Sequence, residues 1–242
     1  MKFYEELANY YEEVFPKGKM QVEFLEQMVG QAPQKVIDIA CGNGVYGIHL
    51  AKMGHKVLLL DLSEAMIRKT KELAVQEGVE IETQVCSMLG LKDIVNSRYN
   101  VAFCIGNSLV HLDSTGEVES FMQEAYSLLE MGGKLILQII NYDRVLDQNV
   151  IGLPTVENKK KDLTFQRDYV LNEDSEKVEF KTILKAGSTS LENSVELLAL
   201  RGSELIRIMQ QTGFRIIGSY GSFKQEAYDP VESVHCIVVG EK

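Results

Sequence analysis

The chain has 242 residues, of which 45% are hydrophobic, 25% are charged and four are prolines, so a fibrous or extensively disordered protein is excluded. Its formal net charge of −10 disfavours sequence-independent binding to nucleic acid or to anionic membranes, because an acidic surface repels phosphate groups. No run approaches the roughly 18 apolar residues of a membrane span, and the acidic N-terminus lacks a signal-peptide core, so we expect a cytoplasmic protein.

The first 140 residues alternate short apolar runs with amphipathic segments, which is the pattern of a parallel sheet wrapped by helices. Five apolar runs are expected to be strands: residues 36–40, 56–61, 80–85, 99–105 and 134–140. The segments between them favour helices, with Ser63 and Ser114 as candidate N-caps and Gly78 as a candidate end.

The pattern changes between Asn141 and Arg201, where the helical period gives way to runs of alternating polarity. Three such runs are expected to be strands: residues 164–171, 177–185 and 194–200. We therefore expect a small antiparallel β insertion over residues 141–201.

A last helix and two last strands are expected after the insertion, over residues 203–211, 214–220 and 234–240. The linker between the two strands is too short for a crossover helix, so they should pair antiparallel. The predicted fold is α/β: a seven-stranded, mostly parallel sheet with helices on both faces, an antiparallel last strand and a small antiparallel β insertion after strand five.

The strongest local signal for chemistry is the sequence from Asp38 to Gly44, between the first expected strand and the first helix. Glycines here let a ligand approach the backbone, and the following helix start offers free N–H groups. Asp61 ends the second strand at the same sheet edge, where a carboxylate can accept two hydrogen bonds from a ribose diol. The alternative is a tight packing turn in which Asp61 only caps a helix.

A dinucleotide site is the competing interpretation. Gly42, Gly44 and Gly47 also satisfy the dinucleotide-binding spacing, and Tyr220 and Lys224 have the Tyr-x-x-x-Lys spacing of some dehydrogenases. Catalysis by that pair needs both residues on one helix, whereas here they leave a strand for a loop. The four cysteines and four histidines lack disulfide or metal-ligand spacing, so no metal site is expected.

The Asp-Ile-Ala-Cys-Gly-Asn-Gly segment, Asp61 and the Gly-Asn-Ser-Leu-Val-His-Leu segment at 106–112 resemble the S-adenosylmethionine-dependent methyltransferases of the Rossmann-like type. Within them, the segments at 104–112, 132–137, 141–143 and 221–224 resemble the small-molecule branch typified by glycine N-methyltransferase. The resemblance implies a methyltransferase domain over residues 1–140 and 202–242, with a helical cap at 1–30, and a substrate lid at 141–201.

The resemblance also implies which residues bind S-adenosylmethionine. Ala40 and Gly42 would contact its methionine part, Asp61 both ribose hydroxyls, and Leu62 the adenine. The remaining expected cofactor-binding residues are Tyr11, Ser87, Met88, Ile105, Gly106 and His111. Ser87 stands where many relatives have Asp or Asn for the adenine amino group, and Tyr4 and Tyr10 share the N-terminal stretch with Tyr11.

A second departure concerns the methyl acceptor. In glycine-methylating relatives an arginine precedes the Asn-Tyr-Asp triplet and pairs with the amino-acid carboxylate, whereas this chain has Ile140 there. Glycine is therefore not the expected substrate. Asn107, Tyr142 and His111 are candidates to orient an acceptor, and no catalytic residue is assigned. Arg167 and Arg201 either supply positive charge or lie on a solvated face.

The sequence thus predicts a methyltransferase that acts on a small molecule, with N slightly favoured over O as acceptor atom. The alternatives are a catalytically silent S-adenosylmethionine-binding regulatory protein and an NAD-dependent dehydrogenase. The acceptor's identity and the oligomeric state stay open.

Overall fold

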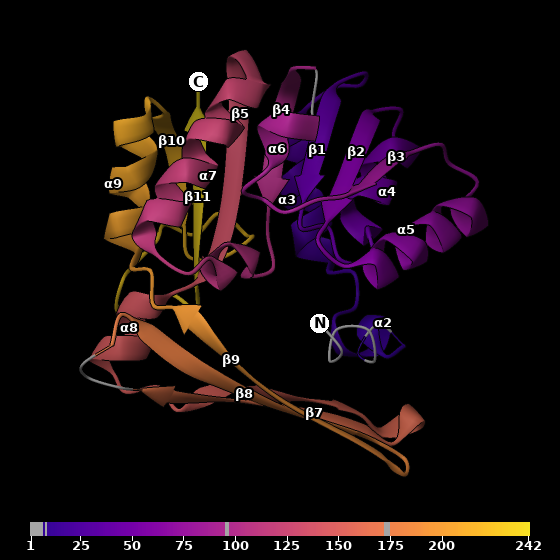
Figure 1. Ribbon diagram of the computed structural model, residues 1–242, viewed down its shortest axis with the longest axis vertical. Coiled ribbons are helices and arrows are strands. Elements are labelled where there is room, and N and C mark those ends of the chain that lie inside the picture. Colours follow the sequence, from indigo (N-terminus) through magenta and orange to yellow (C-terminus); the bar gives the residue numbers. More distant parts are fainter. Residues whose placement is uncertain (1–6, 8, 95–96, 172–174) are drawn as a thin grey trace.

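The computed structural model describes residues 7, 9–94, 97–171 and 175–242, and its central feature is a seven-stranded sheet, sheet A (Figure 1). The strands lie in the order β10-β11-β5-β4-β1-β2-β3. Their bounds are β1 Lys35–Ile39, β2 Lys56–Asp61, β3 Glu82–Val85, β4 Tyr99–Cys104, β5 Leu129–Ile140, β10 Arg215–Tyr220 and β11 His235–Glu241. β11 runs antiparallel to both of its neighbours, and the other pairs are parallel. The predicted α/β fold is confirmed.

Strand order reverses between β1 and β4, because β2 and β3 lie on one side of β1 and the later strands on the other. Ligands of open α/β sheets bind at the carboxyl ends of the strands at such a reversal. β5 begins at Leu129 rather than at residue 134, and its pairing with β4 is irregular, with a register shift between Tyr99 and Val101.

Helices cover both faces of sheet A, as predicted (Figure 1). One face carries α3 Lys19–Val29, α4 Val45–Lys52 and α5 Glu64–Glu77, and the other carries α6 Leu91–Ile94, α7 Thr115–Leu128 and α9 Gly202–Thr212. Successive side chains of β1 point to opposite faces of the sheet. Val36 belongs to the same buried cluster as Phe24 of α3, whereas Ile37 belongs to the same buried cluster as Phe121 of α7. Ser63 and Ser114 accept the backbone N–H of Met66 and Glu117, which makes both serines the N-caps that the sequence predicts.

The insertion forms a four-stranded antiparallel sheet, sheet B, in the order β6-β7-β8-β9. Its strands are β6 Gly152–Asn158, β7 Leu163–Leu171, β8 Lys177–Ala186 and β9 Thr189–Leu198, with a short η2 at Lys159–Lys161. The small antiparallel insertion is confirmed, but the sequence missed β6 and the short α8, Tyr142–Asp147, and began β9 at residue 194. β6 was missed because Pro154 lies in it, and proline is tolerated there since β6 is an edge strand.

Sheet B lies beneath the carboxyl ends of sheet A, with α2, Tyr11–Val14, beside it (Figure 1). The described residues before α3 are called the N-terminal segment. Of these, Leu7 and Val14 share a buried cluster with Leu163, Phe165 and Leu184 of sheet B, so they are held by the insertion. Within the described residues, none of the helices has the length and hydropathy needed to cross a membrane.

Candidate functional site

The glycine-containing loop connects β1 to α4, as the sequence predicts. Ala40 and Gly42 both have φ of +58°, in the left-handed region. A Cβ atom at Gly42 would lie 2.7 Å from the Tyr11 hydroxyl, so an added side chain there would displace Tyr11, in a backbone conformation that favours glycine. The loop therefore presents bare backbone at the amino end of α4, where unpaired N–H groups favour negatively charged or polar ligand atoms.

Asp61 faces this loop. Its Oδ2 accepts a hydrogen bond from the backbone N–H of Gly42 and its Oδ1 accepts one from Ser63, both at 2.8 Å. Burial raises the pKa of Asp61, and the Ser63 and Gly42 N–H groups oppose this shift. Each carboxylate oxygen keeps a second lone pair, so the group is oriented and can still accept hydrogen bonds from a diol.

Tyr11 lies over the same turn. Its hydroxyl approaches Gly42, and its ring packs against Ala65 and Met66 at the start of α5. Tyr10 points elsewhere, with its hydroxyl 3.5 Å from Oγ1 of Thr189 in sheet B. Tyr4 lies outside the described residues. Of the tyrosines that the sequence singled out, Tyr11 is therefore the one placed at the loop.

Leu62, Ser87 and Met88 lie near Asp61, because β2 and β3 are adjacent and Cys86 donates its N–H to the Asp61 carbonyl. Leu62 is 63% exposed, and Ser87 is exposed with its Oγ accepting the Leu89 N–H. The side on which the sequence places the adenine is thus an open surface next to the carboxylate.

A cavity of about 430 Å³ lies between the carboxyl ends of β1, β4 and β5 and the inner face of sheet B. Six of the predicted cofactor-binding and acceptor-orienting residues line it: Tyr11, Ala40, Ile105, Gly106, Asn107 and His111. Sheet B contributes Leu153, Arg167, Phe180 and Leu197. Gly42, Asp61, Leu62, Ser87, Met88 and Tyr142 do not line this cavity.

Asn107 joins the ends of β4 and β5. It has φ of +68°, its Oδ1 accepts the Ile140 N–H at 2.8 Å, and its Nδ2 donates to the Tyr142 hydroxyl at 3.2 Å. Tyr142 has no exposed surface, so it lies behind Asn107. Of these two acceptor-orienting candidates, Asn107 lines the cavity and Tyr142 fixes its orientation.

Two buried polar side chains at the cavity were given no role by the sequence. Asp38 and Asn43 are 3% and 4% exposed, and the Asp38 Oδ2 and both amide atoms of Asn43 have no hydrogen-bond partner among the described residues. Burial raises the pKa of Asp38 well above its usual range. A bound cation would pair with Asp38, and a polar ligand would satisfy Asn43.

Gln138 and His235 were also missed. Gln138 Oε1 accepts the Gly106 N–H, so its Nε2 donates to Nδ1 of His235 and the neutral ring carries its proton on Nε2. β11 is antiparallel to β5, which brings His235 opposite Ile140 and into the cavity wall. The signal available in the sequence was Gln138 itself, a polar residue in the otherwise apolar run from Leu135 to Ile140.

The two histidines at the cavity both have a pKa lowered by burial, although His111 keeps an exposed edge.

The two arginines of the insertion differ: Arg201 bonds to Asp143 at 3.1 Å and to Asp147 at 2.8 Å, whereas Arg167 lines the cavity.

The dehydrogenase interpretation lacks the geometry it needs. Tyr220 is the last residue of β10 and Lys224 lies in the loop that follows, so the two do not share a helix face.

Comparison with known proteins bears on the same residues. Residues 36–133, which contain the glycine loop and Asp61, match the family described as "Methyltransferase domain". The chain is 28% identical over 219 residues to a glycine/sarcosine N-methyltransferase of Halorhodospira halochloris, covering 90% of this chain and 79% of that protein. It is also 28% identical to a glycine/sarcosine/dimethylglycine N-methyltransferase of Actinopolyspora halophila, but spans only 38% of that protein's length.

Among solved structures, the CcbJ methyltransferase from Streptomyces caelestis matches with a TM-score of 0.84 and 21% identity, over 99% of this chain and 97% of that one. This likeness shows that the two share a fold, including the region of the insertion.

Proposed function

We propose that this chain, an S-adenosylmethionine-dependent methyltransferase of the Rossmann-like type, transfers a methyl group to a small-molecule acceptor, with nitrogen slightly favoured over oxygen as the accepting atom. The names of the N-methyltransferases to which it is similar support the nitrogen preference.

The observation that carries the proposal is the hydrogen bond between Asp61 and the backbone of Gly42. It joins a carboxylate that can bind a diol to the backbone of Gly42, which carries no side chain, next to a cavity with the unpaired Oδ2 of Asp38. These groups fit a ligand that carries a ribose, a carboxylate and an ammonium group. We propose that Asp61 binds the ribose hydroxyls and that Asp38 pairs with the ammonium group.

The other binding residues follow from their positions. We propose that Leu62, Ser87 and Met88 surround the adenine, and that Ala40, Gly42, Ile105, Gly106 and His111 contact the methionine part. Tyr11 covers the turn from the N-terminal segment.

When bound, S-adenosylmethionine supplies an electrophilic methyl group on its sulfonium sulfur. The residues of the chain therefore mainly align the acceptor and exclude water, and orientation of this kind can supply about 7–11 kcal/mol. Asn107 is held in place by Ile140 and Tyr142 for this role, and the side chains of Ile105, Ile140 and Phe180 make part of the wall apolar.

We propose that residues 141–201 act as the substrate lid, since sheet B forms one wall of the cavity. A cytoplasmic location is also part of the proposal, supported by four free cysteines of which Cys104 and Cys236 are buried. The net charge of −10 supports a small-molecule partner rather than nucleic acid.

The test is turnover. The protein is incubated with S-adenosylmethionine and a panel of small amines and alcohols, and formation of S-adenosylhomocysteine is measured. We expect turnover with at least one amine and a loss of about a hundredfold or more in Asp61→Ala, since two hydrogen bonds to a charged group are removed. Asp93→Ala, at an exposed carboxylate, is the control. Equal turnover in wild type and Asp61→Ala would contradict the proposal.

A further inference from the structure

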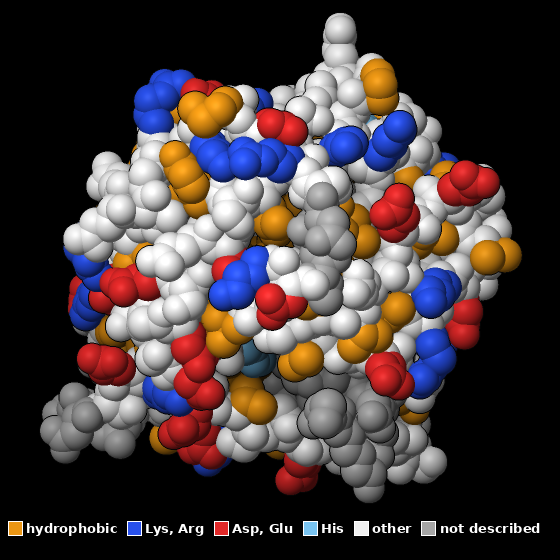
Figure 2. Space-filling view, turned by 45° about the horizontal axis from the view of Figure 1, so that its top comes forward, with side chains coloured by type: hydrophobic (Ala, Val, Ile, Leu, Met, Phe, Trp, Pro, Cys, Tyr) orange, Lys and Arg blue, Asp and Glu red, His pale blue; other side chains and the backbone are white. Residues whose placement is uncertain are grey.

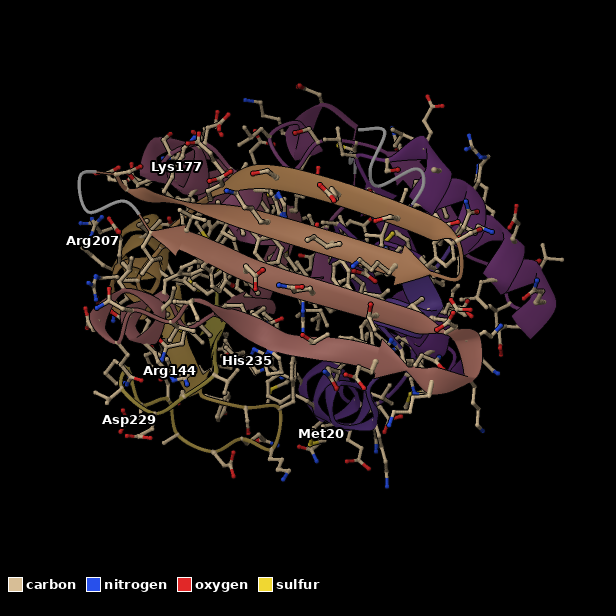
Figure 3. All side chains as sticks on the ribbon, turned by 90° about the horizontal axis from the view of Figure 1, so that it is seen from below. Met20, Arg144, Lys177, Arg207, Asp229 and His235 are labelled. Atoms are coloured by element: carbon tan, nitrogen blue, oxygen red, sulfur yellow. The ribbon has the colours of Figure 1, made fainter. Side chains whose placement is uncertain are left out.

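The inner face of β7 carries one charged residue, Arg167, between apolar neighbours on the same strand. Leu163, Phe165 and Tyr169 of β7 are buried at alternate positions, and Arg167 occupies the position between Phe165 and Tyr169. Since side chains alternate along a strand, Arg167 shares their face. This is the face that meets the cavity, and Arg167 is part of the cavity wall. Seen from below, sheet B spans the underside of the molecule (Figure 3).

Arg167 belongs to a polar row that crosses the sheet. It is paired in register with Thr182 of β8, and Thr182 is paired with Asn193 of β9. Thr182 is 2% exposed, and its hydroxyl has no hydrogen-bond partner among the described residues. A buried hydroxyl without a partner costs free energy, so the row is polar and incompletely hydrogen-bonded. Arg167 is the residue of this row that lines the cavity.

The guanidinium of Arg167 is itself incompletely bonded. Its Nη2 donates to the Pro154 carbonyl at 2.5 Å, while the buried Nε has no partner among the described residues. A guanidinium has five N–H donors, so the Pro154 contact fixes the side chain and leaves donors for a ligand.

The charges around Arg167 do not neutralise it. Within the described residues it has no carboxylate within 4.0 Å, in contrast to Arg201, which bonds to two aspartates. Asp168, the next residue on β7, accepts a hydrogen bond from Gln166 on the opposite face. Burial lowers the pKa of Arg167, which means that its charge is poorly solvated. Arg167 is half-buried, and a partly buried cation without a carboxylate partner is stabilised by a bound anion.

The shape of the guanidinium indicates which anion it would bind. Ile140, the last residue of β5, also lines the cavity and is apolar, so this end of β5 offers no cation there. Arg167 approaches the same cavity from sheet B instead. Its planar fork matches a planar carboxylate through two parallel hydrogen bonds.

We propose that the methyl acceptor carries a carboxylate, and that Arg167 binds this carboxylate from sheet B and thereby selects anionic acceptors over neutral ones. The inference rests on the proposed function, because it concerns the acceptor of that same site. The choice of methyl acceptor is thereby made by a residue of the insertion rather than by a residue at the end of β5.

The experiment measures binding to the protein saturated with S-adenosylhomocysteine, by calorimetry, for pairs of small molecules that differ in charge. The probes are acetate and acetamide, sarcosine and sarcosinamide, and benzoate and benzamide, with methylphosphonate as a separate anion. We expect at least one carboxylate to bind about tenfold or more tightly than its amide, as a charge-assisted bidentate pair implies. In Arg167→Gln this preference should fall below about twofold, and in Arg167→Lys it should be partly kept.

Lys181→Gln is the matched control, because it removes one positive charge from the adjacent strand of sheet B, at an exposed position that is paired with Glu179. It should keep the carboxylate preference. Binding of S-adenosylhomocysteine and the midpoint of thermal unfolding should be unchanged in Arg167→Gln, which separates a specificity role from loss of the fold.

The inference would be overturned if no carboxylate bound more tightly than its amide in wild type, or if the preference survived in Arg167→Gln. Tighter binding of methylphosphonate than of every carboxylate would also overturn it, in favour of a phosphoryl group. Failure of S-adenosylhomocysteine to bind wild type would instead contradict the proposed function, so the two failures are distinguishable.

Discussion

Asp61 and Gly42 are linked by a hydrogen bond of 2.8 Å, although they lie at the ends of different strands. The sequence predicts that they are close, because the carboxyl ends of parallel strands meet at one edge. It could not place Arg167, since alternation along an isolated strand does not say which face is covered. Nor could it place His235, whose position depends on the antiparallel register of β11 with β5.

Substitution of Gly42 tests whether the turn needs an uncovered backbone. Gly42→Ala puts a Cβ atom 2.7 Å from the Tyr11 hydroxyl in a left-handed conformation, whereas Gly78→Ala has φ of +67° with nothing within 4 Å. Both should lower the free energy of unfolding, by about 1 kcal/mol. Only Gly42→Ala should weaken S-adenosylhomocysteine binding, by about tenfold, because the added methyl group must displace the Tyr11 side chain from the turn. Equal affinity in the two variants would show that no ligand approaches this turn.

His55 makes stability depend on pH. Its Nδ1 accepts the Gln34 N–H at 3.2 Å, its buried Nε2 has no partner among the described residues, and burial lowers its pKa. In the unfolded chain a histidine has a pKa of about 6.5. The unfolded state therefore binds the proton first as the pH falls, so the contribution of His55 is complete above about pH 6.5 and is lost below it.

The measurement is urea unfolding of wild type and His55→Asn at pH 7.5 and 5.5. We expect a smaller loss of stability on acidification in the variant, because one neutral buried imidazole has been removed. The same loss in both proteins would mean that His55 is protonated without penalty in the folded state.

At the scale of elements, the five strands and the longer helices before residue 140 were predictable because their periodicities are clear, and β2 has the predicted bounds. The four-residue α6 was not predicted. The insertion was harder: α8 has six residues, too few for a periodic signal, and β6 pairs along one edge only. Their positions depend on contacts between elements that are remote in sequence.

Asn141, where β5 passes into the insertion, makes contacts of this kind with the loop before β11. It is 1% exposed, its Nδ2 donates to the carbonyls of Pro230 and Ser233 at 3.0 and 2.9 Å, and its Oδ1 accepts the Tyr228 hydroxyl at 2.7 Å. Asn141→Ala leaves buried polar atoms without partners and should lower the free energy of unfolding by about 2–4 kcal/mol.

Gln148→Ala is the control for Asn141→Ala, because Gln148 donates to the Val231 carbonyl of the same loop from an exposed position. It should cost less than about 1 kcal/mol. Urea unfolding of the two variants decides the point, and a similar small effect in both would mean that Asn141 does not hold this junction together.

At the scale of the whole molecule, sheet A positions the cofactor residues and sheet B closes the space beyond them (Figure 1). Acidic and basic side chains are interspersed on the face shown in Figure 2, so no large field of one sign favours a polymeric substrate there. The fold was predictable from motifs in the first half of the chain. The acceptor was not, because the cavity combines residues of β1, β4, β5, β11, sheet B and the N-terminal segment.

Calorimetric titration of the whole chain with S-adenosylhomocysteine, beside a titration with NADH, tests the central claim most directly. The account expects S-adenosylhomocysteine to bind one molecule per chain and NADH to give no heat, with affinity for S-adenosylhomocysteine reduced about a hundredfold in Asp61→Ala. No heat with S-adenosylhomocysteine, or heat with NADH alone, would contradict it.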